Sequence, residues 1–270
     1  MWASVRLSRT LVALVSAWLM AAALPGHAAP RRVVSMNLCT DQIAMMLAAP
    51  GQLISVSDLA QDPRMSPMAA QAAAYPINYG RAEEIYLMRP DLVLAGQFAS
   101  GPTVAMLRRL GLQVEVLPPA ESIAAIRNEI THVGALLGQD AQARDLLAQF
   151  DQGLARLASG RDRGRAALYY ANGVTSGPDT LAGTILAQAG FRNIAAEMGI
   201  RHTGSLPMEM LVMSRPDRLI TGAKWPGQSR SEAILDHPAL ARIAPAAQKV
   251  TDQDWICGTP FILRAIESLE

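Results

Sequence analysis

The chain has two cysteines, Cys39 and Cys257, which stand 218 positions apart. We predict that they meet, either as a disulfide or as two thiolates that coordinate a soft metal or the metal of a bound complex. A disulfide here would close a very long loop, which the chain-entropy model values at roughly 5 kcal/mol. It would also need Cα atoms within about 7 Å of each other. The sequence leaves both forms of pairing open.

The other reactive side chains form no catalytic pattern. The histidines after residue 28 are His132, His202 and His237, and no carboxylates cluster with them, so a transition-metal site is not indicated. The segment 173–178 lacks the Lys and the glycine spacing of a phosphate-binding loop. The sequence contains no nucleophile elbow, zinc-protease helix or convincing Ser-His-Asp set. We therefore predict a binding protein that is not an enzyme and has no resident cofactor.

One pattern occurs twice and indicates how the chain is organised. Residues 83–96 and 209–222 share Glu, Arg, Pro, Asp and Gly at a constant offset of 126, with apolar residues between them. Pro cannot continue a helix and disfavours helical geometry in the residue before it. Each copy therefore predicts a short helix, a break at Arg-Pro, a buried strand and a turn at the Gly. The repeat predicts two similar α/β lobes.

Further strands and helices alternate around the two copies. Predicted strands cover residues 32–36, 52–56, 92–95, 112–117, 166–171, 190–195, 219–221 and 248–251. This alternation predicts mostly parallel sheets with helices on both faces. Thr40 or Asp41 is expected to cap a helix over 42–48, and a last helix is expected to start at Pro260. Ligands bind outside the carboxyl ends of such strands, so two facing lobes would form one cleft.

The loops that follow these strands carry the candidate ligand-binding residues. They include the two tryptophans that remain after residue 28, and apolar platforms with a few polar groups are typical of ligand clefts. The candidates are Cys39, Thr40, Tyr79, Gln97, Phe98, Asn172, Thr175, His202, Lys224, Trp225, Trp255 and Cys257. Of these, Cys39 and Cys257 are also candidate metal ligands.

Two helical stretches without an intervening strand connect the halves. Apolar residues recur at three- and four-residue spacing over 123–137 and again over 146–157, and Asp140 is a candidate N-cap of the second stretch. A helix of roughly 20 residues is about 30 Å long, which suffices to cross between lobes. We divide the chain into an N-terminal lobe (29–121), a helical bridge (122–160) and a C-terminal lobe (161–270).

The first 28 residues have the pattern of a signal peptide. Arg6 and Arg9 precede an apolar run from Leu11 to Leu24, and small residues end at Ala28. We expect cleavage there and export to the periplasm as a soluble protein. Without this segment the total formal charge of +1 becomes −1, because two arginines are lost. Such a balance argues against nucleic acid or an anionic membrane as partner.

Together these features resemble the periplasmic binding proteins for cobalamin and iron-siderophores. The resemblance rests on the signal peptide, the turn at Thr40-Asp41, the segment from Glu83 to Val93, the turn 175–177 and the closing segment 254–260. It implies a monomer of two α/β lobes joined by one rigid helix, with a cleft that binds a bulky metal chelate for an ABC permease. In that family a Glu on each lobe meets Arg pockets of the permease. Those positions are Glu83 and Glu209 here.

The sequence departs from that family in its aromatic residues. Where cobalamin binders have a Trp before the first docking Glu, this chain has Ile77 or Tyr79, and the second-lobe counterpart is Thr203. The aromatic position after the first repeated strand is Gly96 or Phe98. A corrin ring would lose stacking surface, and no Arg cluster stands ready for a catecholate chelate. The expected ligand is an iron-siderophore, cobalamin or a related corrinoid or haem-like complex.

Two other functions are alternatives. The first is a chelatase-like or metal-cluster protein on a related two-lobe fold, although cluster chemistry needs more cysteines than the two present. The second is a periplasmic sensor that binds a ligand but docks on a receptor.

Overall fold

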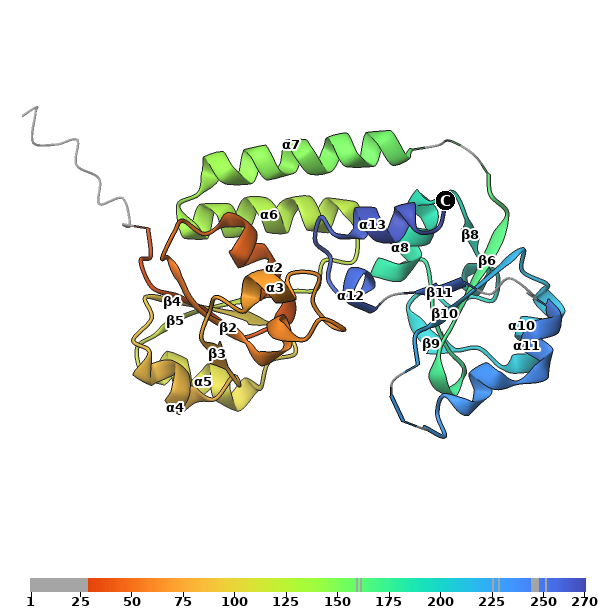
Figure 1. Ribbon diagram of the computed structural model, residues 1–270, viewed down its shortest axis with the longest axis horizontal. Coiled ribbons are helices and arrows are strands. Elements are labelled where there is room, and N and C mark those ends of the chain that lie inside the picture. Colours follow the sequence, from red (N-terminus) through yellow and green to blue (C-terminus); the bar gives the residue numbers. More distant parts are fainter. Residues whose placement is uncertain are drawn as a thin grey trace, which may run out of the picture.

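A computed structural model describes residues 29–270 of this chain, except 159, 161, 225, 228, 244–247 and 251. Two lobes lie side by side, and two long helices lie across one side of them (Figure 1). The expected signal peptide, residues 1–28, and the candidate Trp225 lie outside the described residues. Among the described residues, no helix has both the length and the apolar character needed to cross a membrane.

The first lobe contains a parallel sheet of five described strands in the order β3-β2-β1-β4-β5. The strands are β1 (Val33–Ser35), β2 (Leu53–Ser57), β3 (Ile77–Asn78), β4 (Leu92–Gly96) and β5 (Gln113–Leu117). The helices are α2 (Leu38–Leu47), η1 (Asp58–Gln61), α3 (Ala69–Ala72), α4 (Ala82–Leu87) and α5 (Gly101–Arg109). Every residue of β4 is buried, as a strand with helices on both faces should be. The strand order reverses direction between β1 and β4.

The second lobe contains a parallel sheet of four described strands in the order β11-β10-β6-β8. Its strands are β6 (Arg165–Tyr169), β8 (Arg192–Asn193), β10 (Arg218–Gly222) and β11 (Gln248–Val250), and an antiparallel pair is formed by β7 (Val174–Ser176) and β9 (Thr203–Ser205). The helices are η2 (Ala171–Gly173), α8 (Leu181–Gln188), α9 (Ile194–Glu197), α10 (Met208–Ser214), η3 (Ala233–Asp236), α11 (Pro238–Ile243), α12 (Asp252–Trp255) and α13 (Ile262–Glu267). The two repeated strands, β4 and β10, lie in separate sheets, which confirms the prediction of two α/β lobes.

The repeated Asp makes the same contact in both lobes. Asp91 Oδ2 accepts hydrogen bonds from the backbone N–H groups of Arg31 (2.8 Å) and Arg32 (3.0 Å). Asp217 Oδ2 accepts one from the N–H of Arg165 at 2.7 Å. The N–H of each Asp in turn donates to the carbonyl of Arg32 or Arg165, at 2.8 Å in both cases. Each carboxylate thereby fixes the start of the repeated strand beside the start of the first strand of its lobe.

The repeated Arg ends its helix by an unusual backbone conformation. Arg89 has φ of 48° and Arg215 has φ of 45°, a region that residues with a side chain rarely adopt. The following Pro disfavours the right-handed helical region here, so the chain leaves the helix abruptly. Arg32 Nε donates to the Arg89 carbonyl (3.1 Å), and Arg165 Nη1 donates to the Ser214 carbonyl (2.8 Å). Both helix ends therefore receive a guanidinium at their unpaired carbonyls.

The bridge consists of α6 (Ile123–Leu137) and α7 (Asp140–Leu157). Gly138 ends α6 with φ of 67°, and Ser122 caps its start through a hydrogen bond from Ala125 N–H (3.1 Å). The C-terminal helix α13 packs on α7 so closely that a Cβ on Gly153 would stand 2.4 Å from Leu263 Cδ1. One cluster of buried apolar residues runs through both lobes and the bridge; its members include Val33, Ile126, Phe150, Leu168 and Ile262.

Several local predictions were wrong. Asn37, not Thr40 or Asp41, caps the first helix, which starts at Leu38 rather than residue 42. The N-cap of α7 is Gln139, so Asp140 is already helical. The last helix starts at Ile262 rather than Pro260, and residues 190–195 form a two-residue strand followed by a helix. The position of a helix cap depends on backbone φ and ψ, and a short edge strand depends on its pairing with a neighbouring strand. Residue types alone therefore did not predict these boundaries.

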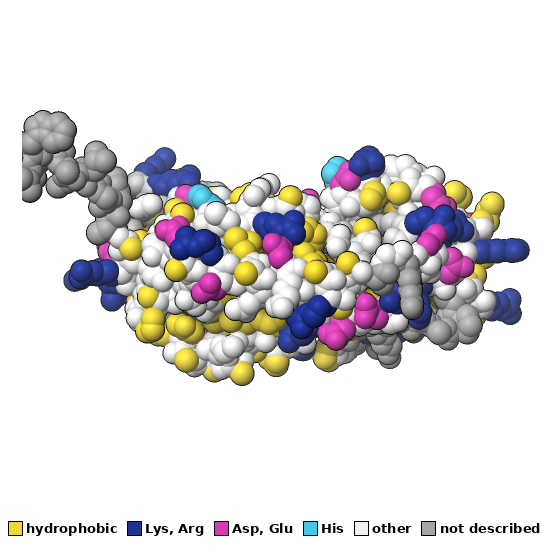
Figure 2. Space-filling view, turned by 90° about the horizontal axis from the view of Figure 1, so that it is seen from above, with side chains coloured by type: hydrophobic (Ala, Val, Ile, Leu, Met, Phe, Trp, Pro, Cys, Tyr) yellow, Lys and Arg dark blue, Asp and Glu magenta, His cyan; other side chains and the backbone are white. Residues whose placement is uncertain are grey.

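The face of the molecule that carries α7 shows Lys and Arg side chains interspersed with Asp and Glu (Figure 2). No basic patch gathers on this face, which agrees with the near-neutral charge of the sequence.

Candidate functional site

A cavity of about 390 Å³ lies between the lobes. On the first lobe it is bounded by the segments that follow β1, β4 and β5. Second-lobe residues close it from the other side; they are Leu181, Ile256 and Gly258. The segments after β1 and β4 flank the point where the strand order reverses, and such a point is where open parallel sheets bind ligands.

Three large apolar side chains stand exposed around this cavity. Phe98 is 83% exposed, Leu59 is 43% exposed and Ile256 is 37% exposed, and all three line it. Exposed aromatic and aliphatic groups that converge on one hollow are a suitable surface for a bulky apolar ligand. Phe98 was predicted from the sequence as a site residue. Leu59 was not predicted; it lies in the short helix η1, two residues after β2 ends.

The floor of the cavity depends on a close contact between the ends of β1 and β4. Asn37 Oδ1 accepts hydrogen bonds from the backbone N–H groups of Cys39 (3.0 Å) and Thr40 (3.5 Å) and thereby starts α2. A Cβ on Gly96 would stand 2.8 Å from Asn37 Cγ, so this close approach requires glycine. The repeated Gly of the second lobe lies in the same way beside the residue after β6, since a Cβ on Gly222 would stand 3.5 Å from Tyr170 Cδ1.

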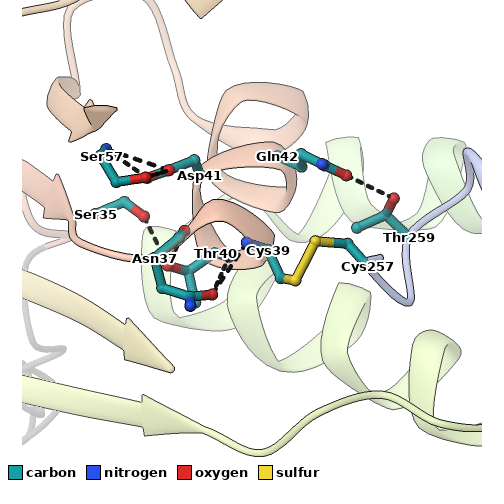
Figure 3. The surroundings of a disulfide bond; sticks show 9 residues. All are labelled: Ser35, Asn37, Cys39, Thr40, Asp41, Gln42, Ser57, Cys257 and Thr259. Carbon is teal, nitrogen blue, oxygen red and sulfur yellow. Dashed lines mark hydrogen bonds between the residues drawn. A yellow bond between two sulfur atoms is a disulfide. The ribbon is translucent and has the colours of Figure 1, made fainter. Parts of the chain in front are cut away.

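Cys39 and Cys257 form a disulfide that joins the lobes, with their Cα atoms 5.2 Å apart (Figure 3). The predicted pairing is thus confirmed as a disulfide, and the alternative of two metal-binding thiolates is wrong. Within the described residues, no group of three or more His, Cys, Asp or Glu side chains is arranged to hold a metal ion. Next to the disulfide, Thr259 Oγ1 donates to Gln42 Oε1 at 2.9 Å across the same junction.

Two further contacts hold the lobes together beside the cavity. Thr184 Oγ1 of the second lobe donates to the carbonyl of Glu121 at 2.7 Å. A Cβ on Gly258 would stand 2.1 Å from the Ala120 carbonyl oxygen, so the two backbones meet directly. The walls of the cavity are therefore connected by a covalent bond, two hydrogen bonds and a tight backbone contact.

Asp41 is fully buried and points toward Ser57, on the side of α2 away from the disulfide (Figure 3). Its carboxylate accepts hydrogen bonds from the Ser57 N–H (3.1 and 3.2 Å) and from the Ser57 hydroxyl. Burial raises the pKa of Asp41 to about 7, although these hydrogen bonds work in the opposite direction. The group is thus held by local contacts at a cost in free energy whenever it is ionised.

The predicted residues of the first lobe reach the cavity in part. Cys39, Thr40, Gln97 and Phe98 line it. The Thr40 hydroxyl is already used, because it donates to the Asn37 carbonyl (2.9 Å) and shares a hydrogen bond with Ser35 Oγ (2.7 Å). Tyr79 is 58% exposed and stacks with the Arg81 guanidinium at 5.7 Å, but it does not line the cavity.

The predicted residues of the second lobe are more scattered. Thr175 is buried in β7 and donates to the Leu168 carbonyl at 2.7 Å. Trp255 is 9% exposed and belongs to the main apolar cluster, so neither residue presents its side chain to the cleft in this structure. The expected loops at Asn172 and His202 flank the β7–β9 pair. Lys224 forms an ion pair with Asp236.

A second hollow, of about 470 Å³, lies where the strand order of the second lobe reverses. It follows β6 and β10, and its lining includes Tyr170, Ala171, Gly222, Ala223 and Glu232. Each sheet therefore has a hollow at its reversal point. The hollow of the first lobe is the one that also contacts the other lobe.

We expect the disulfide to contribute strongly to stability. Replacing both Cys39 and Cys257 by Ser should lower the free energy of unfolding by about 3–5 kcal/mol, because the link constrains a very long loop in the unfolded chain. Urea unfolding measures this change. Cys39→Ser alone should cost nearly as much as the double change, since either removes the link. Two titratable thiols in the unfolded, unreduced parent protein would contradict the disulfide.

The buried Asp41 predicts a pH dependence. Its pKa is higher in the folded than in the unfolded chain, so the folded state holds the extra proton between about pH 4 and pH 7. The free energy of unfolding should fall as pH rises through this window, by on the order of 4 kcal/mol at most, and level off above it. Asp41→Asn keeps an acceptor for Ser57 and should reduce the slope in urea unfolding at pH 5 to 8, while Glu129, whose pKa is also raised to about 7, continues to contribute. Equal slopes in both proteins would refute this assignment.

The chain has similarities to proteins of known type. A family model described as periplasmic binding protein matches residues 33–250. A cobalamin-binding protein of Halobacterium salinarum is 30% identical over 227 residues, which cover 81% of this chain. The matched region covers 59% of that relative, so this chain spans less than two thirds of its length.

Solved structures share the fold. A periplasmic haem-binding protein from Roseiflexus sp. RS-1 superimposes with a TM-score of 0.72 at 24% identity, covering 88% of this chain and 97% of that one. The periplasmic vitamin B12 binding protein of Vibrio cholerae gives a TM-score of 0.66 at 19% identity, covering 89% and 95%. An Fe3+-hydroxamate transport protein from Saccharomonospora viridis gives 0.69 at 20% identity, covering 89% and 92%. At these identities the likeness concerns the fold.

Proposed function

The chain belongs to the periplasmic binding protein family, and from this premise we propose that it carries a metal chelate to an ABC importer. The proposed ligand is an iron-siderophore, a cobalamin or a related corrinoid or haem-like complex, bound in the cavity between the lobes. One observation carries the proposal: Phe98, Leu59 and Ile256 are exposed around a cavity at the reversal point of the first sheet. In this proposal residues 1–28 direct export to the periplasm, and 122–160 bridge the lobes 29–121 and 161–270.

Delivery requires a docking surface, for which the repeat offers a matched pair of helices. Glu83 and Glu209 are exposed in the first turns of α4 and α10, one on each lobe (Figure 1). One helical turn later, Leu87 is 78% exposed and Met213 is 76% exposed. Residues four apart lie on the same face of a helix. Each lobe thus presents a carboxylate beside an exposed apolar side chain, at equivalent places.

A partner with two basic pockets, each bordered by apolar side chains, would fit this pair. We propose the ABC permease as that partner. No specific observation favours a chelatase-like or metal-cluster activity. The sensor alternative would use the same cavity and differs only in the partner that these helices contact.

Binding of metal chelates to the purified chain tests the first half of the proposal. Cyanocobalamin, haemin, ferrioxamine B and ferrichrome are titrated separately, and at least one should bind with a Kd below ~1 μM. Phe98→Ala should weaken that binding by about 5- to 150-fold, because a stacking aromatic contributes roughly 1–3 kcal/mol. Met106→Ala is the matched control, since Met106 is 46% exposed on α5 and does not line the cavity. Absence of binding to every chelate would overturn the proposal.

Charge reversal at the two docking helices tests the second half. The double variant Glu83→Arg/Glu209→Arg should abolish uptake in cells while the affinity for the chelate stays within about twofold, because these side chains do not line the cavity. The variant Asp145→Arg/Glu267→Arg changes the net charge equally at exposed sites on α7 and α13 and should transport normally. Unaltered uptake by the first variant would refute docking through these residues.

A further inference from the structure

The cavity between the lobes has an unbalanced set of charges. Its described lining residues include two carboxylates, Glu121 and Glu129, and no Arg or Lys. Its remaining polar side chains are neutral, and among them the amides of Asn37 and Gln97 can both donate and accept hydrogen bonds.

Glu129 is the carboxylate that matters most. It projects from the bridging helix α6 and is partly buried, and it also lines an adjoining hollow with Asn128 and His132. Within the described residues its carboxylate has no hydrogen-bond or ion-pair partner. Burial raises the pKa of Glu129 to about 7.

The titratable neighbours do not neutralise this group. His132, one turn further along α6, is paired with Glu115 of β5 at 2.9 Å. Glu121 is exposed at the rim and has the same sign as Glu129. Arg127 of α6 is held by Asp151 of α7 at 2.8 Å. The cavity therefore has, on its bridge side, a carboxyl group without a compensating cation among the described residues.

A cation next to the cavity lining is also committed elsewhere. Arg64, which precedes the lining residue Met65, binds both carboxylate oxygens of Asp62 at 3.0 and 2.6 Å. A ligand with several negative charges would therefore meet carboxylates without a matching cation, and burying it there would be strongly unfavourable.

From this arrangement we infer that the cavity selects metal chelates without net negative charge and that Glu129 receives a cationic or N–H donor group of the ligand. The inference rests on the proposed function and narrows it. Neutral chelates rich in amide groups and hydroxamate chelates with a free ammonium group fit the cavity. Ferric tricatecholates and haem, whose catecholate or propionate groups are anionic, do not fit it.

A matched set of probes tests the selectivity. Ferrioxamine B, which keeps a free ammonium group, is compared with its N-acetylated form, which is neutral, and with cyanocobalamin, ferric enterobactin and haemin. The tightest neutral or cationic probe should bind at least ~100-fold more tightly than either anionic probe, because like charges oppose each other in a partly desolvated site. Ferrioxamine B should also bind more tightly than its N-acetylated form.

Substitution of Glu129 tests the residue. Glu129→Gln should weaken the binding of ferrioxamine B by about tenfold and leave the affinity for the N-acetylated form within twofold. It should also strengthen the binding of the anionic probes. Ferrioxamine B should bind more tightly as pH rises from 6 to 8, since the carboxylate becomes ionised, and Glu129→Gln should remove this trend. Glu267→Gln, at an exposed site on α13, should change none of these values. Because the amide removes a partly buried charge, the variant should remain folded.

The outcomes separate the inference from the proposed function. Tight binding of ferric enterobactin or haemin, with weak binding of the other probes, would overturn the inference and leave the carrier function in place. Unchanged selectivity in Glu129→Gln would also overturn the role of this residue. If no chelate of any charge binds, both the carrier function and the inference fall.

Discussion

The covalent link between Cys39 and Cys257 sets the relation of the two lobes. It joins the first turn of α2 to the segment before the last helix, and those two segments form opposite walls of the cavity. The Thr259–Gln42 hydrogen bond and the contact of Gly258 with Ala120 lie on the same junction. A cavity whose walls are connected in this way is largely preformed. A ligand then binds without a large cost for ordering the two lobes.

The repeated segment shows how far sequence reasoning reaches. The spacing of Glu, Arg, Pro, Asp and Gly was enough to predict a helix, a break and a buried strand in each lobe. The role of the repeated Asp became clear only from the structure, because Asp91 and Asp217 accept hydrogen bonds from backbone groups more than 50 positions away. The Gly of the first copy is explained only by Asn37, which lies too close to it to leave room for a Cβ.

The lining of the cavity was predicted in part on the first lobe and poorly on the second. Gln97 and Phe98 follow a long buried strand, so their place at its carboxyl end could be deduced from the pattern alone. Thr175 and Trp255 also follow predicted elements, but their side chains are buried. Thr175 lies in the three-residue strand β7, and Trp255 packs in the apolar core. The sequence did not predict that Glu129 lines the cavity. On an amphipathic helix, a carboxylate between apolar positions is indistinguishable from a solvent-exposed residue.

Equivalent positions of the two lobes carry similar residues on α4 and α10 but different residues at the cavity. Glu83 corresponds to Glu209, and the exposed Leu87 corresponds to the exposed Met213. In contrast, position 98 has Phe and its counterpart at 224 has Lys. A partner with twofold symmetry would require equal surfaces on both lobes. A small chelate, the proposed ligand, has no such symmetry, and the carboxyl group in its proposed site comes from α6. The repeated positions are therefore similar at the proposed docking surface and different at the proposed ligand site.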